Sequence, residues 1–333
     1  MRAPLADALT GCLLGQALGD ALGFVVEAAL PEIADSYVEQ DLCSDRPGSR
    51  SHADFPFGQY SDDTQLAREL LCSIRASGCW DPADFSRRLG AIVGSDRLVG
   101  SGPGTRFAAE RLLAGARWQD AGRPAPYAGN GSAMRAAPLG IVFRDDPEMM
   151  RRVVVEQSTI THQDPRCAAG AVVVAGAAAL GSIGERIEPE AFLEQLAVWA
   201  ASEERSVADA VRVVADWLPL APGAAATRLH ESGLDSAASD RWLGVSSFVV
   251  PSVVWSLYAF LRTPDDYWTT VCTAIRVGGD TDTMAAIAGG IAGARVGLSG
   301  LPTELIAALN DRGEWGATQL VELACECARV VTH

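Results

Sequence analysis

Four glycines spaced four residues apart near the N-terminus constrain the packing of this chain more than any other feature. They are Gly11, Gly15, Gly19 and Gly23. Residues four apart lie close to one stripe of an α-helix, so the spacing predicts a helix over 5–24 with one face free of side chains. Such a face lets another backbone approach closely, and we therefore expect this helix to be buried.

The rest of the chain has helical patterns separated by Gly and Pro, and alternation typical of strands is scarce. The patterns predict helices over 63–77, 82–93, 104–115, 133–143, 147–158, 165–183, 189–202, 205–217, 247–262, 264–275, 282–296, 302–311 and 315–330. We predict an all-α fold that forms a single domain over 1–333. Residues 31–60 are interpreted as an irregular connection anchored by Phe55-Pro56-Phe57-Gly58, and residues 219–246 as a mobile surface loop.

Composition excludes several classes of protein. The 333 residues are 48% hydrophobic, which is enough for a large core, and the formal net charge is −15. All 27 basic residues are Arg, so a Schiff-base lysine and a Walker A phosphate loop are excluded. An acidic chain without a basic cluster is not expected to bind nucleic acid.

The cysteines and the apolar N-terminal stretch indicate in which cellular compartment the protein is expected. The eight cysteines contain no C-x-x-C pair and are interpreted as reduced core thiols of a cytoplasmic protein. The apolar stretch 9–26 is interrupted by Asp20 and lacks a convincing cleavage site. We therefore expect neither a signal peptide nor a membrane span.

Two clusters of acids and hydroxyls each precede a helical run. One is Val277-Gly278-Gly279-Asp280-Thr281-Asp282-Thr283-Met284, and the other is Ser61-Asp62-Asp63-Thr64. One acid and one hydroxyl would satisfy a helix cap, so both clusters have a surplus. Converging acids need a cation between them, and oxygen ligands without Cys or His suit Mg²⁺, Mn²⁺ or Ca²⁺. A shared metal site and two independent caps are the alternatives.

Two further polar segments interrupt the apolar pattern. Gly129-Asn130-Gly131-Ser132-Ala133-Met134-Arg135 is a glycine-rich turn that enters a helix, which would present free N–H groups to a phosphate. An ordinary Asn-Gly turn is the alternative. His162 precedes a helix that Asp164 would cap, and in isolation such a histidine is a structural hydrogen bonder. Tyr127, beside this turn, is an aromatic residue that would pack in the core or line a site.

Taken together, these segments resemble the ADP-ribosylglycohydrolase superfamily, which includes the dinitrogenase reductase-activating glycohydrolase and the ADP-ribosyl-acceptor hydrolases. The resemblance spans residues 11–300 in order. The glycine-striped helix and Glu27 resemble the opening helix and catalytic glutamate of the family. Ser61-Asp62-Asp63-Thr64 resembles its first metal motif, which usually begins with Thr, and Gly278 to Thr283 resembles its second.

The resemblance implies a compact orthogonal multi-helix bundle with two Mg²⁺ (or Mn²⁺) ions at the bottom of a cleft. It implies Glu27 as the catalytic residue and a Gly-rich segment, 99–106, at the mouth. The implied metal ligands are Ser61, Asp62, Asp63, Asp280, Asp282 and Thr283. The expected substrate-binding residues are Gly129, Asn130, Gly131, Ser132, Met134, His162 and Tyr127.

The function implied is a metal-dependent hydrolase that releases ADP-ribose from a modified protein side chain or a small ADP-ribosyl conjugate. Cleavage at the ribosyl C1 passes through an oxocarbenium-like state, which needs a positioned ribose and an activated water. Paired metals can supply both, and Glu27 would be a general acid/base or a gate that ligates a metal. The alternatives are a non-catalytic ADP-ribose-binding or structural member and an unrelated Mg²⁺ phosphohydrolase. The sequence leaves the acceptor open.

Overall fold

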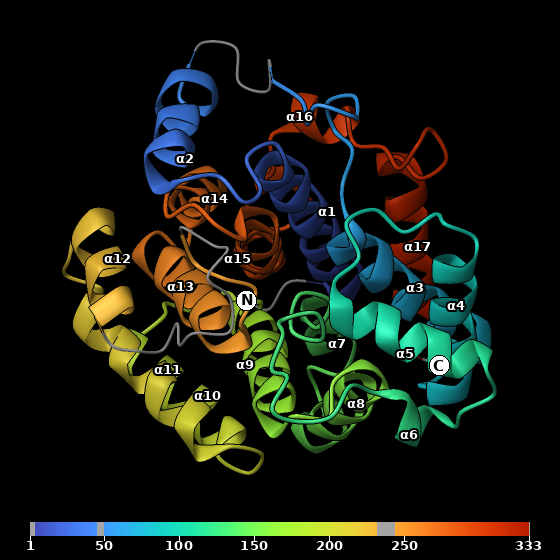
Figure 1. The fold of residues 1–333 in the computed structure, drawn as a ribbon. Coiled ribbons are helices and arrows are strands. Elements are labelled where there is room, and N and C mark those ends of the chain that lie inside the picture. Colours follow the sequence, from blue (N-terminus) through green and yellow to red (C-terminus); the bar gives the residue numbers. More distant parts are fainter. Residues whose placement is uncertain (1–3, 45–49, 232–243, 333) are drawn as a thin grey trace.

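The computed structural model describes residues 4–44, 50–231 and 244–332, and within these ranges it is all-α, as predicted. Isolated bridges are the only β-pairing in the described ranges. The helices, shown in Figure 1, are α1 Leu5–Phe24, α2 Pro31–Tyr37, η1 Val38–Leu42, α3 Asp62–Ser77, α4 Pro82–Gly94, α5 Pro103–Leu113, α6 Trp118–Ala121, α7 Ala137–Val142, α8 Pro147–Thr161, α9 Pro165–Gly181, α10 Pro189–Ala200, α11 Arg205–Trp217, α12 Pro222–Glu231, α13 Val249–Arg262, α14 Tyr267–Ile275, α15 Thr281–Val296, η2 Leu298–Gly300, α16 Thr303–Ala307 and α17 Ala317–Val330.

The pairing of α1 with α15 forms the centre of the fold and confirms the expectation from the glycine stripe. The two helices cross at backbone contact: a Cβ on Gly19 would lie 2.1 Å from the carbonyl oxygen of Ala285, and one on Gly11 would lie 2.3 Å from that of Gly293. Successive glycines along α1 contact residues of α15 with successively lower residue numbers, so the two helices are antiparallel. The C-terminal end of α1 therefore lies beside the N-terminal end of α15.

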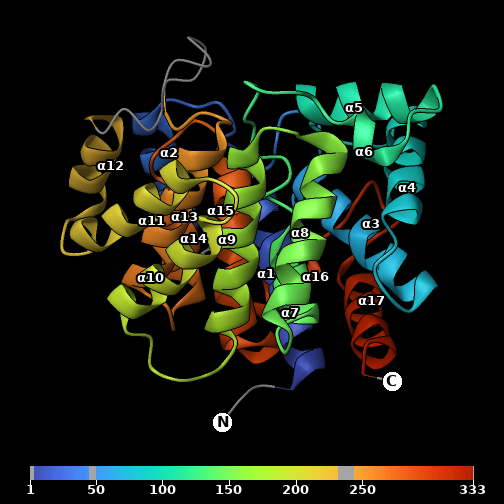
Figure 2. The same ribbon diagram turned by 90° about the horizontal axis from the view of Figure 1, so that it is seen from below.

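Other helices enclose this central pair. Helices α3, α7, α9, α13, α14 and α17 all contact α1 or α15. Figure 2 shows α10–α12 on one side of the pair and α3–α6 on the other. Every residue of α1 from Ala8 to Phe24 is buried. The core is continuous around α1 and α15, which fixes their ends relative to each other.

The structure corrects the interpretation of two segments. Residues 31–60 contain α2 and η1, because Pro31 stands at the first position of a helix, where its missing N–H is not needed. Helix α12 likewise begins at Pro222, within the segment 219–246 interpreted as a loop. The remaining part of that segment, 232–243, lies outside the described residues.

Two predicted helices are about half as long as expected, and the short helices α6 and η2 were not predicted. The segment 133–143 becomes helical only at Ala137, because residues 131–135 form turns. The segment 302–311 is helical over Thr303–Ala307. Cys43 and Cys79 are exposed, so the description of all cysteines as core residues was wrong. No helix in the described ranges has both the length and the apolar character to cross a bilayer.

Candidate active site

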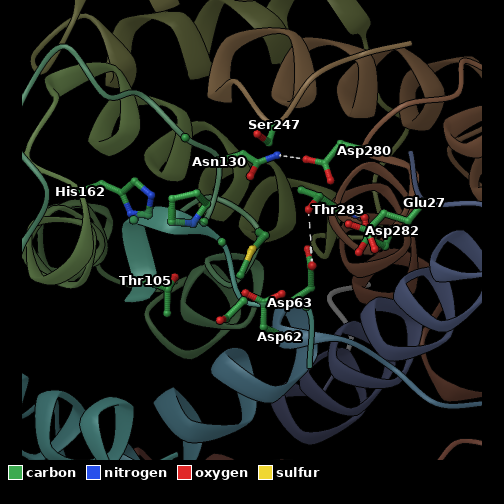
Figure 3. Close-up of a pocket in the computed structure, with 18 of the residues that line it drawn as sticks. Glu27, Asp62, Asp63, Thr105, Asn130, His162, Ser247, Asp280, Asp282 and Thr283 are labelled. Carbon is green, nitrogen blue, oxygen red and sulfur yellow. Dashed lines mark hydrogen bonds between the residues drawn. The ribbon is translucent and has the colours of Figure 1, made fainter. Parts of the chain in front are cut away.

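The ends of α1, α3, α5 and α15 meet around one cavity (Figure 3). Glu27 comes from the turn after α1, and Asp62 and Asp63 from the first turn of α3. Asp280 and Asp282 come from the start of α15. The cavity is lined by Glu27, Asp62, Asp63, Gly100, Ser101, Gly102, Pro103, Gly104, Thr105, Tyr127, Gly129, Asn130, Gly131, Met134, His162, Ser247, Asp280, Asp282 and Thr283.

The acidic residues of both sequence clusters converge on this cavity. One ligand oxygen each of Glu27, Asp280 and Asp282 lie within 4.8 Å of one another. A second group with the same spacing contains Asp20, Asp63 and Asp282. Asp282 belongs to both groups and therefore joins them. Residues more than two hundred positions apart are thus brought together by the antiparallel pairing of α1 with α15.

Asp20 is a site residue that the sequence interpretation missed. It is fully buried on α1, and its carboxylate accepts hydrogen bonds from the backbone N–H of Ser61 (2.8 Å) and Thr64 (3.0 Å) and from the Thr64 hydroxyl (2.7 Å). These bonds fix the first turn of α3 against α1. The available signal was the one carboxylate in the stretch 8–24 of this helix, since buried Asp is rare unless it is paired.

Helix capping does not account for the surplus acids. The Ser61 hydroxyl accepts from the Asp63 N–H (3.4 Å), and Asp20 satisfies the neighbouring N–H groups. Asp280 precedes α15, yet its side chain makes no capping hydrogen bond. The carboxylates of Asp62 and Asp280 instead face the cavity. Independent helix caps therefore explain the hydrogen bond of Ser61 but not the positions of the Asp62 and Asp280 carboxylates.

Mutual repulsion and burial raise the pKa values of the acids. The charge of Asp282, followed by burial, raises the pKa of Glu27 to about 10. Burial, followed by the charge of Asp282, raises the pKa of Asp62 to about 8, and burial raises those of Asp63 and Asp280 well above the usual range. None of the ion pairs among the described residues involves these carboxylates. The cluster therefore needs protons or a bound cation to balance its charge.

The donor set fits oxygen-preferring divalent cations. Oδ1 of Asp63 is buried and has no hydrogen-bond partner among the described residues, which is costly for a carboxylate oxygen unless a cation binds it. Oδ2 of the same residue accepts from the hydroxyls of Ser61 (3.0 Å) and Thr283 (3.4 Å). Only oxygen ligands converge here, a set that suits Mg²⁺ or Mn²⁺. Thr283 lines the cavity, whereas the Ser61 side chain lies behind Asp63.

The glycine-rich turn lines the cavity through Gly129, Asn130, Gly131 and Met134 and is hydrogen-bonded to the acidic cluster. The side-chain amide of Asn130 donates to Oδ2 of Asp280 (2.5 Å), and its backbone N–H donates to the Ser247 carbonyl (3.0 Å). Ser247, which also lines the cavity, was not predicted. Ser132 does not line it, because its hydroxyl accepts from Ser158 (2.9 Å) and donates to the Cys167 carbonyl (3.3 Å).

His162 and Tyr127 lie together at the far end of the cavity from Glu27. Their rings stack with centroids 5.7 Å apart, and the guanidinium of Arg123 lies 4.0 Å from the Tyr127 ring centroid. Burial, with smaller effects of Arg135 and Arg123, lowers the pKa of His162 to about 3. The imidazole is therefore neutral at physiological pH.

Residues 100–105 of the Gly-rich segment 99–106 line the cavity. Gly100 has a left-handed backbone (φ 77°), which glycine adopts without strain. The carbonyl of Val99 accepts from the Asp62 N–H (2.8 Å), so this segment is fixed to the start of α3. Gly102 then precedes α5, whose first turn faces the cavity.

Comparisons with known proteins agree with this architecture. A family model described as ADP-ribosylglycohydrolase matches residues 1–332. The ADP-ribosylhydrolase ARH3 of Bos taurus is 31% identical over 323 residues, which cover 88% of this chain and 86% of that protein. The ADP-ribosyl-dinitrogen reductase glycohydrolase of Rhodospirillum rubrum is 27% identical over 313 residues, with 92% of each chain covered. A solved structure, an ADP-ribosylglycohydrolase-related protein complex, has a TM-score of 0.70 and 26% identity and covers 98% of this chain and 99% of its own.

Proposed function

Because the chain belongs to the ADP-ribosylglycohydrolase family, we propose that it is a metal-dependent hydrolase that cleaves the glycosidic bond between ADP-ribose and an acceptor. The observation that carries this proposal is the convergence of Glu27 with the buried aspartates of α3 and α15 in one cavity, beside the glycine-rich turn. ADP-ribose would be the product. A modified protein side chain or a small ADP-ribosyl conjugate would be the substrate.

We propose that two divalent ions, Mg²⁺ or Mn²⁺, bind to the acidic cluster. When bound, they supply positive charge that orients the ribose hydroxyls and acidifies a water molecule. The residues that would hold them are Ser61, Asp62, Asp63, Asp280, Asp282 and Thr283. Support comes from Oδ1 of Asp63, which is buried without a hydrogen-bond partner among the described residues, and from the two clusters of three carboxylates that share Asp282.

Glu27 is the proposed general acid/base. Glu27 is half-buried in the turn after α1, and one of its carboxylate oxygens lies within 4.8 Å of carboxylate oxygens of Asp280 and Asp282. In the metal-free protein the charge of Asp282 raises the pKa of this carboxyl, and bound cations would offset that charge. The carboxyl would then exchange a proton with water or the leaving group. The rigid α1–α15 contact fixes the backbone on both sides of this group.

The other end of the cavity would bind the diphosphate and adenosine parts of ADP-ribose. Gly129 and Gly131 would place backbone N–H groups beside the phosphates, and the Tyr127 ring would stack on the adenine. Asn130 would contribute through its side chain, because its backbone N–H already donates to a carbonyl of a neighbouring segment. Met134 adds an apolar surface to the lining. A neutral His162 contributes a hydrogen bond without placing a positive charge at the phosphates. In a chain of net charge −15, phosphate binding has to come from such local groups and the metals.

The acceptor is to be identified by a substrate panel. Peptides with ADP-ribose linked to Arg, Ser or Cys, together with O-acetyl-ADP-ribose, would be incubated with Mg²⁺ or Mn²⁺. The mass of the released product is then measured. Intact ADP-ribose is expected, whereas AMP or phosphate would indicate a phosphohydrolase and refute the proposal.

The variant Glu27→Gln distinguishes an enzyme from a binding protein. It should keep the melting temperature and ADP-ribose affinity close to wild type, while single-turnover rates fall by roughly 10²–10⁴, the usual contribution of a positioned acid/base. A fully active variant would remove the catalytic role from Glu27. Wild-type protein that binds ADP-ribose and turns over none of the substrates would be a non-catalytic member of the family.

A further inference from the structure

Three buried side chains, those of Arg135, Thr161 and His162, are joined in series by hydrogen bonds, and His162 lines the cavity. Arg135 follows the glycine-rich turn and is fully buried, and none of the ion pairs among the described residues includes it. Its Nε donates to Oε1 of Gln157 (2.7 Å), and its Nη2 donates to the Gln157 carbonyl (3.0 Å) and to Oγ1 of Thr161 (2.8 Å). Thr161 then contacts Nδ1 of His162 through the same Oγ1 (2.8 Å).

The direction of the Thr161–His162 hydrogen bond follows from the donors present. A guanidinium only donates, so Oγ1 of Thr161 must accept from Arg135. The Thr161 hydroxyl hydrogen then needs an acceptor. Among the described residues, Nδ1 of His162 is the second partner of this oxygen. The hydroxyl therefore donates to Nδ1, and a neutral imidazole in this arrangement carries its hydrogen on Nε2.

The opposite edge of the imidazole faces the cavity. A Cβ on Gly104 would lie 2.5 Å from Nε2 of His162, and a Cβ on Gly131 would lie 2.9 Å from Cε1. His162 and both glycines line the cavity, and a side chain at either glycine would cover this edge of the ring. Whether Nε2 is a donor or an acceptor therefore decides which ligand atoms it can bind.

We propose that Arg135 and Thr161 are positioning residues that fix His162 as the Nε2–H tautomer, so that it donates a hydrogen bond to an oxygen of the bound ligand. A phosphate or ribose oxygen accepts this bond, whereas an unprotonated Nε2 would repel it. The identity of the ligand rests on the proposed function. The tautomer itself does not, because it follows from the protein's own hydrogen bonds.

The tautomer can be measured by NMR. Full-length protein labelled with ¹⁵N in histidine gives a long-range ¹H–¹⁵N spectrum that distinguishes a ring nitrogen with hydrogen from one without, and His162→Gln assigns the signal. Wild type and Thr161→Ser should show Nε2–H alone at pH 7. Thr161→Val, which lacks the donor, should show a mixture with Nδ1–H. Should Thr161→Val fail to fold, Arg135→Met provides the second variant, because it frees Oγ1 of Thr161 to accept from Nδ1–H.

Calorimetry with ADP-ribose gives the functional consequence. Thr161→Val should weaken binding by roughly 3- to 10-fold, the loss of about one hydrogen bond. Thr161→Ser should restore wild-type affinity. Thr159→Val is a matched control on the same helix, since its hydroxyl donates to the Val155 carbonyl (3.0 Å) and not to His162.

Two outcomes would overturn the proposal: a wild-type ring with hydrogen on Nδ1 or on both nitrogens, or a Thr161→Val spectrum identical to wild type. Protein that shows the expected tautomers but does not bind ADP-ribose would refute the proposed function and leave the positioning role intact.

Discussion

The variant Gly19→Ala tests whether the α1–α15 contact sets the geometry of the cavity. A Cβ at this position would lie 2.1 Å from the carbonyl oxygen of Ala285, whereas real Cβ atoms keep at least 3.0 Å. The obstacle is backbone, so the helices must separate locally by at least ~0.9 Å, the difference of these two distances. Overpacking of this kind costs ~1–3 kcal/mol, and at ~2–4 °C per kcal/mol the melting temperature should fall by about 2–12 °C.

The same displacement should also reduce activity. Asp20 is the next residue on α1 and Glu27 follows its end, while Asp282 is fixed on α15, so separation changes the distances within the acidic cluster. A misplacement of about 1 Å can cost ~100-fold in rate. Gly223→Ala is the matched control, because Gly223 is also helical and a Cβ there meets nothing within 4 Å. Differential scanning calorimetry and single-turnover kinetics on both variants give the answer. A Gly19→Ala protein with wild-type melting temperature and rate would refute the reasoning.

Three further predictions concern the cavity. In EDTA, the free energy of unfolding should fall as pH rises from about 5.5 to 8. The raised pKa values of Glu27 and Asp62 make the folded state bind protons that the unfolded chain has released. Each such proton should lower the free energy of unfolding by roughly 1 kcal/mol per pH unit. Saturating Mg²⁺ should flatten this slope; urea titrations measure it, and stability that rises with pH would contradict it. Asp20→Asn turns an NH₂ group toward a backbone N–H at the start of α3, so it should lower the free energy of unfolding by ~1–3 kcal/mol and weaken Mg²⁺ binding. An unchanged melting temperature would count against the capping role. Gly131→Ala should displace His162 and weaken ADP-ribose binding about tenfold by calorimetry, with wild-type affinity as the contrary result.

Sequence patterns predicted the central part of the fold well because few structures satisfy them. A four-residue glycine spacing has little use outside close helix contact, and each of the four glycines of α1 meets backbone of α15. Acids in excess of what a cap needs raised a shared metal site as one alternative, and the structure brings the two clusters together around one cavity. Two helices that begin with proline, α2 and α12, were missed because Pro also marks turns.

Side-chain roles that depend on three-dimensional partners could not be predicted from the sequence. Ser132 stands in a cavity-lining turn, yet its hydroxyl faces Ser158 on α8. Asp20 was used only as evidence against a membrane span, because its partners lie more than forty residues away on α3. Ser247 reaches the cavity from a segment without a motif. Each of these assignments depends on which helix end lies opposite, and local periodicity does not contain that information.

The position of Asp20 explains how a repulsive cluster persists in a stable fold. Burial, followed by the charge of Asp282, raises its pKa to about 7, so holding this carboxylate ionised is costly. Two backbone N–H groups and a hydroxyl of α3 favour the ionised form, and these bonds also fix α3 to α1. The interaction that orients Asp62 and Asp63 toward the cavity is therefore the one that holds a neighbouring charge in place. A bound cation would relieve the remaining repulsion, so metal binding and the packing of α3 on α1 should be coupled, each strengthening the other.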